Sequence, residues 1–298
     1  MDCHTPDELA QVRRFNRAVT QNVGALDTSF LGRGRSLGAA RIVSEVGQGR
    51  YDVGEMRRRL GLDSGLLSRL LRALEADGLI TTHPHPDDAR RRLVHLTDKG
   101  RQEFASYETL SDAHAAHVLA QHRDRPALLA AMELVTCALG RDRIDLVECD
   151  PRSEAALYCL NQYYSELAER FSEGFDVDKS LDPTPFDMMR PRGMFLVAQL
   201  DGVPLGCVGL KGTGGPVGEV KRLWVLKCAR GIGLAKRLMV AVEEAAVDLK
   251  FTTLRLDTKR LLTEAVTYYQ SAGWSEVDRF NDDPYPDIFF EKHLSPRS

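Results

Sequence analysis

The stretch from 218 to 239 constrains the fold most strongly, because it reads as a strand, a tight turn and an amphipathic helix in direct succession. β-branched and aromatic residues favour an extended chain over 219–225. Gly231 and Gly233 in the turn have no Cβ, so backbone N–H groups at the helix N-terminus can approach a ligand closely. The helix dipole is positive at that end, and the stretch therefore predicts a pyrophosphate-binding loop. Apolar residues then recur close to every 3.6 positions, as on one face of a helix: Leu234, Leu238, Val242, Ala245 and Leu249.

The turn lacks the residues that define two well-known phosphate-binding loops. A Walker loop needs two glycines five positions apart followed by Lys and Ser or Thr, and the stretch has no such pattern. The dinucleotide fingerprint needs a third Gly or Ala at the position that Lys236 occupies. The pattern that remains is Arg230-x-x-Gly233-x-Ala235. Taken alone, it also fits a glycine turn that precedes a helix and binds no ligand.

Two segments downstream give the loop its context. Residues 254–258 alternate as a strand, and residues 265–274 read as a helix that ends on Gly273, with Tyr269 four positions before that glycine. Loop, strand and tyrosine helix, in this order, resemble GNAT-type N-acetyltransferases, whose acyl-CoA loop reads Arg/Gln-x-x-Gly-x-Gly/Ala and whose later helix ends in Tyr-x-x-x-Gly-Phe. Trp274 stands where that family has phenylalanine. The resemblance covers residues 144–294 and implies an α/β acyl-CoA N-acyltransferase domain with a mixed, mostly antiparallel central sheet.

The resemblance implies acetyl-CoA as the acetyl donor. The backbone of Leu223, Trp224 and Val225 is expected to pair with the pantetheine arm as an added strand would. The proline-containing segment 172–192 corresponds to the region that lines the acceptor site in such enzymes. The pyrophosphate is expected to lie in the loop between strand and helix: Arg230, Gly231, Ile232, Gly233, Leu234, Ala235 and Lys236.

Acetyl transfer from a thioester to an amine requires a neutral amine, a polarised carbonyl and a proton for the leaving thiolate. Glu219 is the only acid in the central strand, and we assign it as the general base, acting directly or through water. A plain strand-end carboxylate is the alternative reading. Tyr269 occupies the tyrosine position of the family, and its phenol is expected to protonate the CoA thiolate. The adjacent Tyr268 stays open as a second candidate acid or as a core residue.

The N-terminal part contains a helix-turn-helix pattern. Asp52 and Asp63 each stand at a cap position before a short helix, and Gly61 lies in the turn between the two helices. The second helix, 64–77, carries leucines on one side and hydroxyl and guanidinium groups on the other. Such groups suit base edges and phosphates in a major groove, although an ordinary solvated face is the alternative. The candidate DNA-binding residues of this helix are Ser64, Ser68, Arg69 and Arg72.

A hairpin follows this helix. Residues 79–83 and 90–96 read as strands around a turn, and three arginines at the tip suit phosphates or a minor groove: Arg90, Arg91 and Arg92. The spacing Asp88-x-Arg90-x-x-x-Val94-x-Leu96-Thr97-x-x-Gly100 resembles the wing of MarR-type winged-helix regulators, over residues 5–140. The resemblance implies a homodimer on a palindromic double-stranded operator. Its interface would be formed by the first helix and by helices 97–122 and 126–139.

Length and composition set the outer limits. A chain of 298 residues suggests two domains, and we expect a winged helix-turn-helix DNA-binding and dimerisation domain over 1–140 and an acetyltransferase domain over 144–298. No run of 18 apolar residues and no charged-then-apolar leader occurs, which predicts a cytoplasmic protein without a membrane segment. The six cysteines include no Cys-x-x-Cys, so no metal site is expected. With a net charge of −3, DNA binding requires a local basic patch.

The sequence therefore predicts a mainly α winged domain followed by an α/β domain, and a bifunctional transcriptional regulator and acetyl-CoA-dependent N-acetyltransferase. The acceptor amine stays open between a small molecule, an amino acid and a protein lysine or N-terminus. The alternative is a DNA-binding regulator whose second domain is an inactive sensor of acetyl-CoA or of another small ligand. The presence of Glu219 and Tyr269 beside the loop favours the enzyme.

Overall fold

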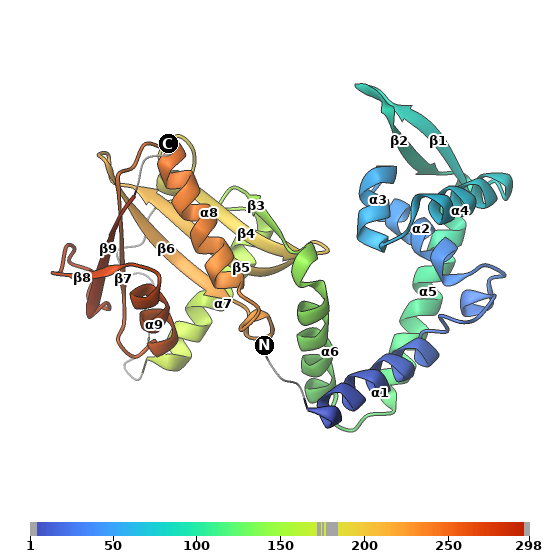
Figure 1. Cartoon of the computed structure of the whole chain (residues 1–298), viewed down its shortest axis with the longest axis horizontal. Coiled ribbons are helices and arrows are strands. Elements are labelled where there is room, and N and C mark those ends of the chain that lie inside the picture. The colour runs from blue at the N-terminus through green and yellow to red at the C-terminus, as the bar shows by residue number, and fades with distance from the viewer. Residues whose placement is uncertain (1–4, 172–173, 175, 177–183, 295–298) are drawn as a thin grey trace. The chain divides into compact units, whose positions relative to one another are not determined.

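The structure is a computed structural model, and it describes residues 5–171, 174, 176 and 184–294. Part of the segment 172–192, to which the sequence assigned the acceptor site, lies outside the described residues. The chain divides into two compact units, Met1–Arg125 and Pro126–Ser298, and Figure 1 shows the elements of both. None of the helices in the described part is long and apolar enough to cross a membrane.

The first unit is helical with one small hairpin, as predicted. Its elements are α1 (Pro6–Asn22), η1 (Phe30–Gly32), α2 (Leu37–Gly47), α3 (Val53–Leu60), α4 (Ser64–Ala76), β1 (Ile80–His85), β2 (Asp88–Leu96) and α5 (Asp98–Ala120). The predicted caps are confirmed, because the Asp52 carboxylate accepts from the Glu55 backbone N–H at 2.9 Å and that of Asp63 from the Leu66 N–H at 2.8 Å.

The core of the first unit holds the helix-turn-helix and the wing together. Strands β1 and β2 pair antiparallel, from Ile80 opposite Leu96 outward. Gly100 in the first turn of α5 lies so close to the hairpin that a Cβ there would be 2.0 Å from the Leu79 carbonyl oxygen. Only glycine therefore fits at this position, which explains its place in the wing pattern. The fully buried side chains include Ile42, Val43, Met56, Leu67, Leu74, Leu79 and Val94.

The second unit is an α/β domain built on one sheet. Its elements are α6 (Arg125–Gly140), η2 (Arg141–Arg143), β3 (Asp145–Glu148), α7 (Glu154–Arg170), η4 (Pro185–Met188), β4 (Met194–Leu200), β5 (Val203–Gly212), β6 (Val217–Val225), η5 (Lys227–Ala229), α8 (Leu234–Asp248), β7 (Thr253–Thr258), α9 (Thr263–Ser271), β8 (Ser275–Val277) and β9 (Ile288–His293). The strand order is β3-β4-β5-β6-β7-β9-β8. Every pairing is antiparallel except that of β6 with β7, so the predicted mixed, mostly antiparallel sheet is confirmed.

Helices cover both faces of this sheet (Figure 1). On one face α8 packs through Leu238 and Val242 onto Val208 and Val220. On the other face α7 packs through Ala156 and Cys159, in a cluster that also contains Phe195, Val197, Cys207 and Trp224. Neighbouring strand residues alternate between the two clusters because successive side chains of a strand point to opposite faces.

Helix α6 groups with the second unit. Its Cys137 is buried in the core on the α8 side of the sheet. Gly140, at its end, lies against Leu200, where a Cβ would come within 2.5 Å of a leucine methyl group. The compact units thus divide at residues 125 and 126, whereas the domain limits of 1–140 and 144–298 stay a prediction.

Candidate active site and DNA-binding surface

The site of the second unit begins where strands β6 and β7 separate. The two strands pair in parallel only over Val217–Glu219 and Thr253–Arg255. A register shift in the pairing of β5 with β6 marks a bulge, where Arg222 adopts a φ of 60°. The rest of β6 turns away from β7, so that backbone and side chains of both strands face an opening between α7 and α9.

The outer part of this opening is a cavity of about 550 Å³, which we name the loop cavity. Its walls come from the end of β6, the loop before α8, and one side each of α7 and α9. All of the predicted cofactor-binding residues except Ile232 line it: Leu223, Trp224, Val225, Arg230, Gly231, Gly233, Leu234, Ala235 and Lys236. The structure therefore brings the two separately predicted parts of the cofactor site to one place.

The loop itself is shaped by its glycines. Gly231 and Gly233 have φ values of 80° and 83°, in the left-handed region that favours glycine. Gly233 is the N-cap of α8, so the unpaired N–H groups of the first helical turn lie beside the loop. Lys236 lines the cavity, and a guanidinium nitrogen of Arg141 lies 3.7 Å from where a Cβ on Gly233 would be. Two cations at the positive end of a helix create a site for an anion.

Arg230 is held by a residue that the sequence analysis missed. Its guanidinium donates to the Glu166 carboxylate on α7 at 2.5 Å and to the Val225 carbonyl at 2.9 Å. The indole N–H of Trp224 donates to the same Glu166 oxygen at 3.0 Å. Burial raises the pKa of Glu166, but the hydrogen bonds from Arg230 and Trp224 outweigh it and leave the pKa lowered. Glu166 is therefore ionised, and it fixes both the loop and the end of β6.

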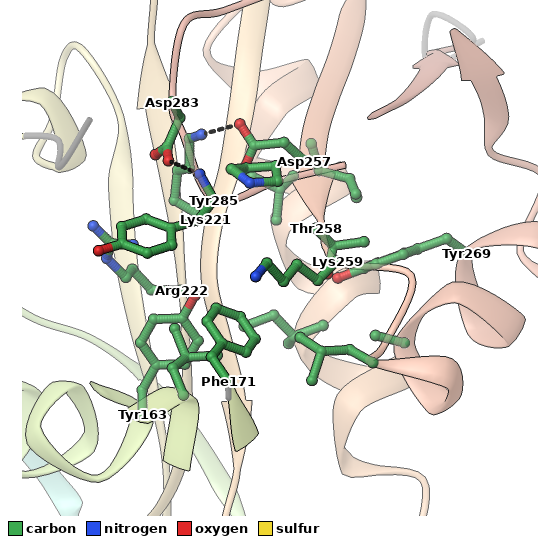
Figure 2. Close-up of a pocket in the computed structure, with 17 residues that line it drawn as sticks. Tyr163, Phe171, Lys221, Arg222, Asp257, Thr258, Lys259, Tyr269, Asp283 and Tyr285 are labelled. Atoms are coloured by element: carbon green, nitrogen blue, oxygen red, sulfur yellow. Dashed lines mark hydrogen bonds and ion pairs between the residues drawn. The ribbon is translucent and has the colours of Figure 1, made fainter. Parts of the chain in front are cut away.

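A second cavity of about 120 Å³ continues inward, and we name it the inner cavity. It shares part of its wall with the loop cavity: Tyr163, Leu167, Leu223, Leu262 and Ala265. Figure 2 shows its aromatic and charged side chains converging from α7, β6, β7, α9 and the chain before β9. The charged residues that line it are Lys221, Arg222, Asp257, Lys259 and Asp283.

Tyr269 lines the inner cavity, as its predicted role requires. Its side chain packs among aromatic rings, with the centroids of Trp274 and Phe290 at 5.9 and 5.6 Å, and only 6% of the residue is exposed. Burial raises the pKa of Tyr269 well above the ordinary value of a phenol, so the group carries its proton at neutral pH. Tyr268 lines the loop cavity instead, where it stays a second candidate for the acid.

Glu219 is not one of the described residues that line the loop cavity or the inner cavity. One of its carboxylate oxygens lies 3.5 Å from the Lys211 ammonium and 3.6 Å from that of Lys221. Lys221 lies in turn 2.7 Å from Asp257, a carboxylate that does line the inner cavity. Burial lowers the pKa of Lys221, but the charges of Asp257 and Glu219 outweigh it and raise the pKa, so Lys221 is an ammonium. The role of Glu219 as base stays a prediction.

Asp257 was missed because the sequence shows only an acid near the end of an alternating strand. One signal was available. The carboxyl ends of parallel neighbours meet at the same edge of a sheet, and β6 and β7 are the one parallel pair of the described sheet. Recognising that pairing would have placed Asp257 beside the bulge of β6.

The first unit carries a basic groove between helices α3 and α4 and strand β2 of the hairpin, which we name the wing groove. This groove of about 610 Å³ brings Ser64 and Ser68 of α4 together with the three wing arginines, Arg90, Arg91 and Arg92. Arg91 is fixed there by an ion pair of 2.8 Å with Asp52. Arg69 and Arg72 are exposed on α4 but are not part of the groove wall.

Arg57 and Arg58 of α3 also line the wing groove, and the sequence analysis missed them. The available signal was the run of three arginines, 57–59, that ends this helix. Five arginines thus face the groove against two carboxylates, Asp52 and Glu55. The net positive charge supplies the local patch that a chain of net charge −3 needs for binding a polyanion.

Both units match known families. The acetyltransferase (GNAT) family profile matches residues 160–274, and the MarR family profile matches residues 34–91. An uncharacterized N-acetyltransferase of Schizosaccharomyces pombe is 29% identical over 136 residues, which are 43% of this chain and 83% of that protein. An IAA acetyltransferase of Azospirillum brasilense is 33% identical over 112 residues, 36% of this chain and 72% of that protein. An uncharacterized HTH-type transcriptional regulator of Bacillus subtilis is 30% identical over 66 residues, 22% of this chain and 40% of that protein.

The fold and the two family matches together define a winged helix-turn-helix unit followed by a unit of the GNAT acetyltransferase fold. The chain belongs to the GNAT acetyltransferase family through its second unit, and its first unit contains a MarR-family domain at residues 34–91.

Proposed function

We propose that this chain is both a DNA-binding transcriptional regulator and an N-acetyltransferase that transfers the acetyl group of acetyl-CoA to an amine. The observation that supports the enzymatic part of the proposal is that the two cavities of the second unit adjoin one another. The loop cavity, with the predicted cofactor residues in its wall, adjoins an inner cavity that contains Tyr269. A sensor that only bound acetyl-CoA would not need a second, charged cavity with a protonated phenol beside the first.

The residues of the second unit divide the work as follows. Acetyl-CoA, when bound, supplies the acetyl group as a thioester. The N–H groups of the loop, with Lys236 and Arg141, hold the pyrophosphate, and the backbone of 223–225 orients the pantetheine arm. The attacking amine forms its bond to the thioester carbon and the C–S bond breaks. Tyr269 gives its proton to the sulfur, and Glu219, which lines neither cavity, takes the proton of the amine through water.

The DNA-binding part rests on the wing groove and on exposed apolar surface. Base edges would be read by Ser64, Ser68 and Arg69 of α4, while Arg72 and the wing arginines contact phosphates or a minor groove. Apolar side chains lie exposed on two helices, which supports a homodimer: Leu9, Val12, Phe15 and Val19 on α1, and Leu129, Met132 and Leu134 on α6. A dimer would place two α4 helices in major grooves about 34 Å apart on a palindromic operator. Such a regulator is expected to act in the cytoplasm.

Release of free thiol from acetyl-CoA, measured against a panel of amines, amino acids and peptides, tests the enzymatic part. Turnover with at least one acceptor, lost in Tyr269→Phe, is the expected result. Tight binding of acetyl-CoA without turnover on any acceptor would instead establish the inactive sensor. DNA binding is tested separately, by selecting duplexes from a random library with the full chain.

A further inference from the structure

One carboxylate oxygen of Asp257 accepts two hydrogen bonds, and the other is accessible from the inner cavity. Oδ2 accepts from the Lys221 ammonium at 2.7 Å and from the Asn281 amide at 2.5 Å. No donor among the described residues reaches Oδ1. This oxygen is not fully buried, so a ligand can approach it. The side chain is only 9% exposed and lines the inner cavity. Two donors therefore fix a nearly buried carboxylate while its second oxygen remains free to accept from a ligand.

Lys259 presents the opposite charge to the same space. Its ammonium lies over the Phe171 ring, 4.1 Å from the centroid, and forms no ion pair with a carboxylate in the part of the chain that the structure describes. Lys221 differs, because Asp257 and Glu219 compensate its charge. Lys259 is thus the lysine of the inner cavity whose charge is left for a ligand to neutralise. Figure 2 shows its side chain extending into the cavity.

Size limits what fits between these two groups. The inner cavity measures about 120 Å³. An engineered protein cavity of roughly 150 Å³ holds a benzene molecule, so the inner cavity has room for a group of a few heavy atoms, which is the size of a small amino acid. A carboxylate and an ammonium that face one space of this size complement a ligand carrying both an amine and an acid. A simple alkylamine would satisfy Asp257 but would leave the Lys259 charge without a partner.

We propose that the acceptor is a small amino acid, with its amine bound at Oδ1 of Asp257 and its carboxylate at the ammonium of Lys259. The inference rests on the proposed acetyltransferase function and specifies its substrate class. Asp257 acts here by binding and orienting the amine, while removal of the amine proton remains with the base. An amino acid bound in this way pairs with Asp257 and with Lys259 at once, which gives selectivity against amines that lack the acid.

The test compares each small L-amino acid with its own carboxamide, which keeps the amine and removes the carboxylate charge. Wild-type protein should acetylate the amino acids with a much lower KM than the carboxamides. Lys259→Met keeps the length of the side chain and removes its charge. A hydrogen bond to a charged group contributes about 1.5–3 kcal/mol, so KM for the amino acid should rise roughly 10- to 150-fold, while KM for the carboxamide should not change.

Controls separate this effect from loss of structure. Lys259→Arg restores the charge and should restore most of the preference. Lys250→Met is a matched control, because Lys250 is exposed two residues beyond α8 and lines neither cavity. Asp257→Asn should raise KM for amino acids and carboxamides alike, since both present an amine.

Calorimetry gives a readout that does not depend on turnover. With CoA present, the amino acid should bind wild type and Lys250→Met equally well, and Lys259→Met roughly 10- to 150-fold more weakly. Carboxamides or peptides accepted as well as free amino acids would overturn the substrate class and leave the acetyltransferase standing. If the amino acids bind but no acceptor is turned over, the enzymatic proposal fails while the binding site stands. Absence of both binding and turnover would overturn both.

Discussion

Glu166 is predicted to be a principal support of the acyl-CoA site, although it lies on a helix 64 positions away from the loop residue that it binds. Its carboxylate accepts from the Arg230 guanidinium and the Trp224 indole, and lies 3.0 Å from the Arg170 guanidinium. The two ion pairs are partly exposed and contribute roughly 0.2–1 kcal/mol each. The indole N–H of the buried Trp224 would lose its partner at a cost of about 1–3 kcal/mol. Glu166→Ala should therefore lower the free energy of unfolding of the second unit by about 1.4–5 kcal/mol.

Glu166→Gln is the matched variant, because its amide oxygen still accepts from the Trp224 indole while the charge is lost. Its expected cost is about 0.4–2 kcal/mol, and the difference between the two variants measures the indole hydrogen bond. The assay is urea unfolding of the full chain, followed by tryptophan fluorescence. Both tryptophans, Trp224 and Trp274, belong to the second unit, so the signal reports on that unit alone.

The pH dependence gives an independent check. The folded pKa of Glu166 is lowered from its ordinary value of 4.5, so the unfolded state binds its proton first as the pH falls. The contribution of the carboxylate is therefore present above pH 4.5 and is lost as the pH falls through the folded pKa. The stability difference between wild type and Glu166→Gln should shrink over that range. Equal losses in the Ala and Gln variants, or a difference that does not change with pH, would refute this account.

Four further predictions address the other sites. Tyr269→Phe keeps the ring and removes the proton donor, so kcat should fall about 10²–10⁴-fold with the Kd for acetyl-CoA unchanged, and a rate within about threefold of wild type would exclude the acid role. The rate deficit of Glu219→Gln should shrink as the pH rises and free amine becomes abundant, which a pH–rate profile with one accepted amine checks. Gly233→Asp introduces a negative charge into the loop. Repulsion between two unit charges at an assumed separation of about 6 Å and an effective dielectric constant of about 20 is about 2.8 kcal/mol, so the Kd for acetyl-CoA by calorimetry should rise on the order of 100-fold. Unchanged affinity would exclude the loop as the pyrophosphate site. Replacing Arg90 and Arg91 by Ala should weaken duplex binding and reduce its salt dependence, and an unchanged salt slope would argue against contacts between the wing and DNA.

The residues that line the loop cavity were identified from the sequence more completely than those that line the inner cavity, for a physical reason. The loop residues are contiguous, and their role depends on backbone N–H groups and glycine conformations that the local sequence determines. The inner cavity is assembled from five segments, and its chemistry depends on which side chains meet. Asp257 on β7 forms an ion pair with Lys221 on β6. Glu219, the acid that the sequence favoured, contacts the same lysine but does not line the cavity.

The sequence by itself determined the order of elements, the helix caps, the glycine loop and the wing, and with them the matches to the GNAT and MarR profiles. These features depend on residues within a few positions of one another, so a local pattern is sufficient to specify them. Only the tertiary structure decided that Glu166 holds Arg230, that Arg57 and Arg58 join the wing groove, and that Asp257 and Lys259 share one cavity. The bulge at Arg222 shows why. A single extra residue in β6 reverses the side-chain alternation after it, and the face that each later residue occupies is then set by pairing with β5.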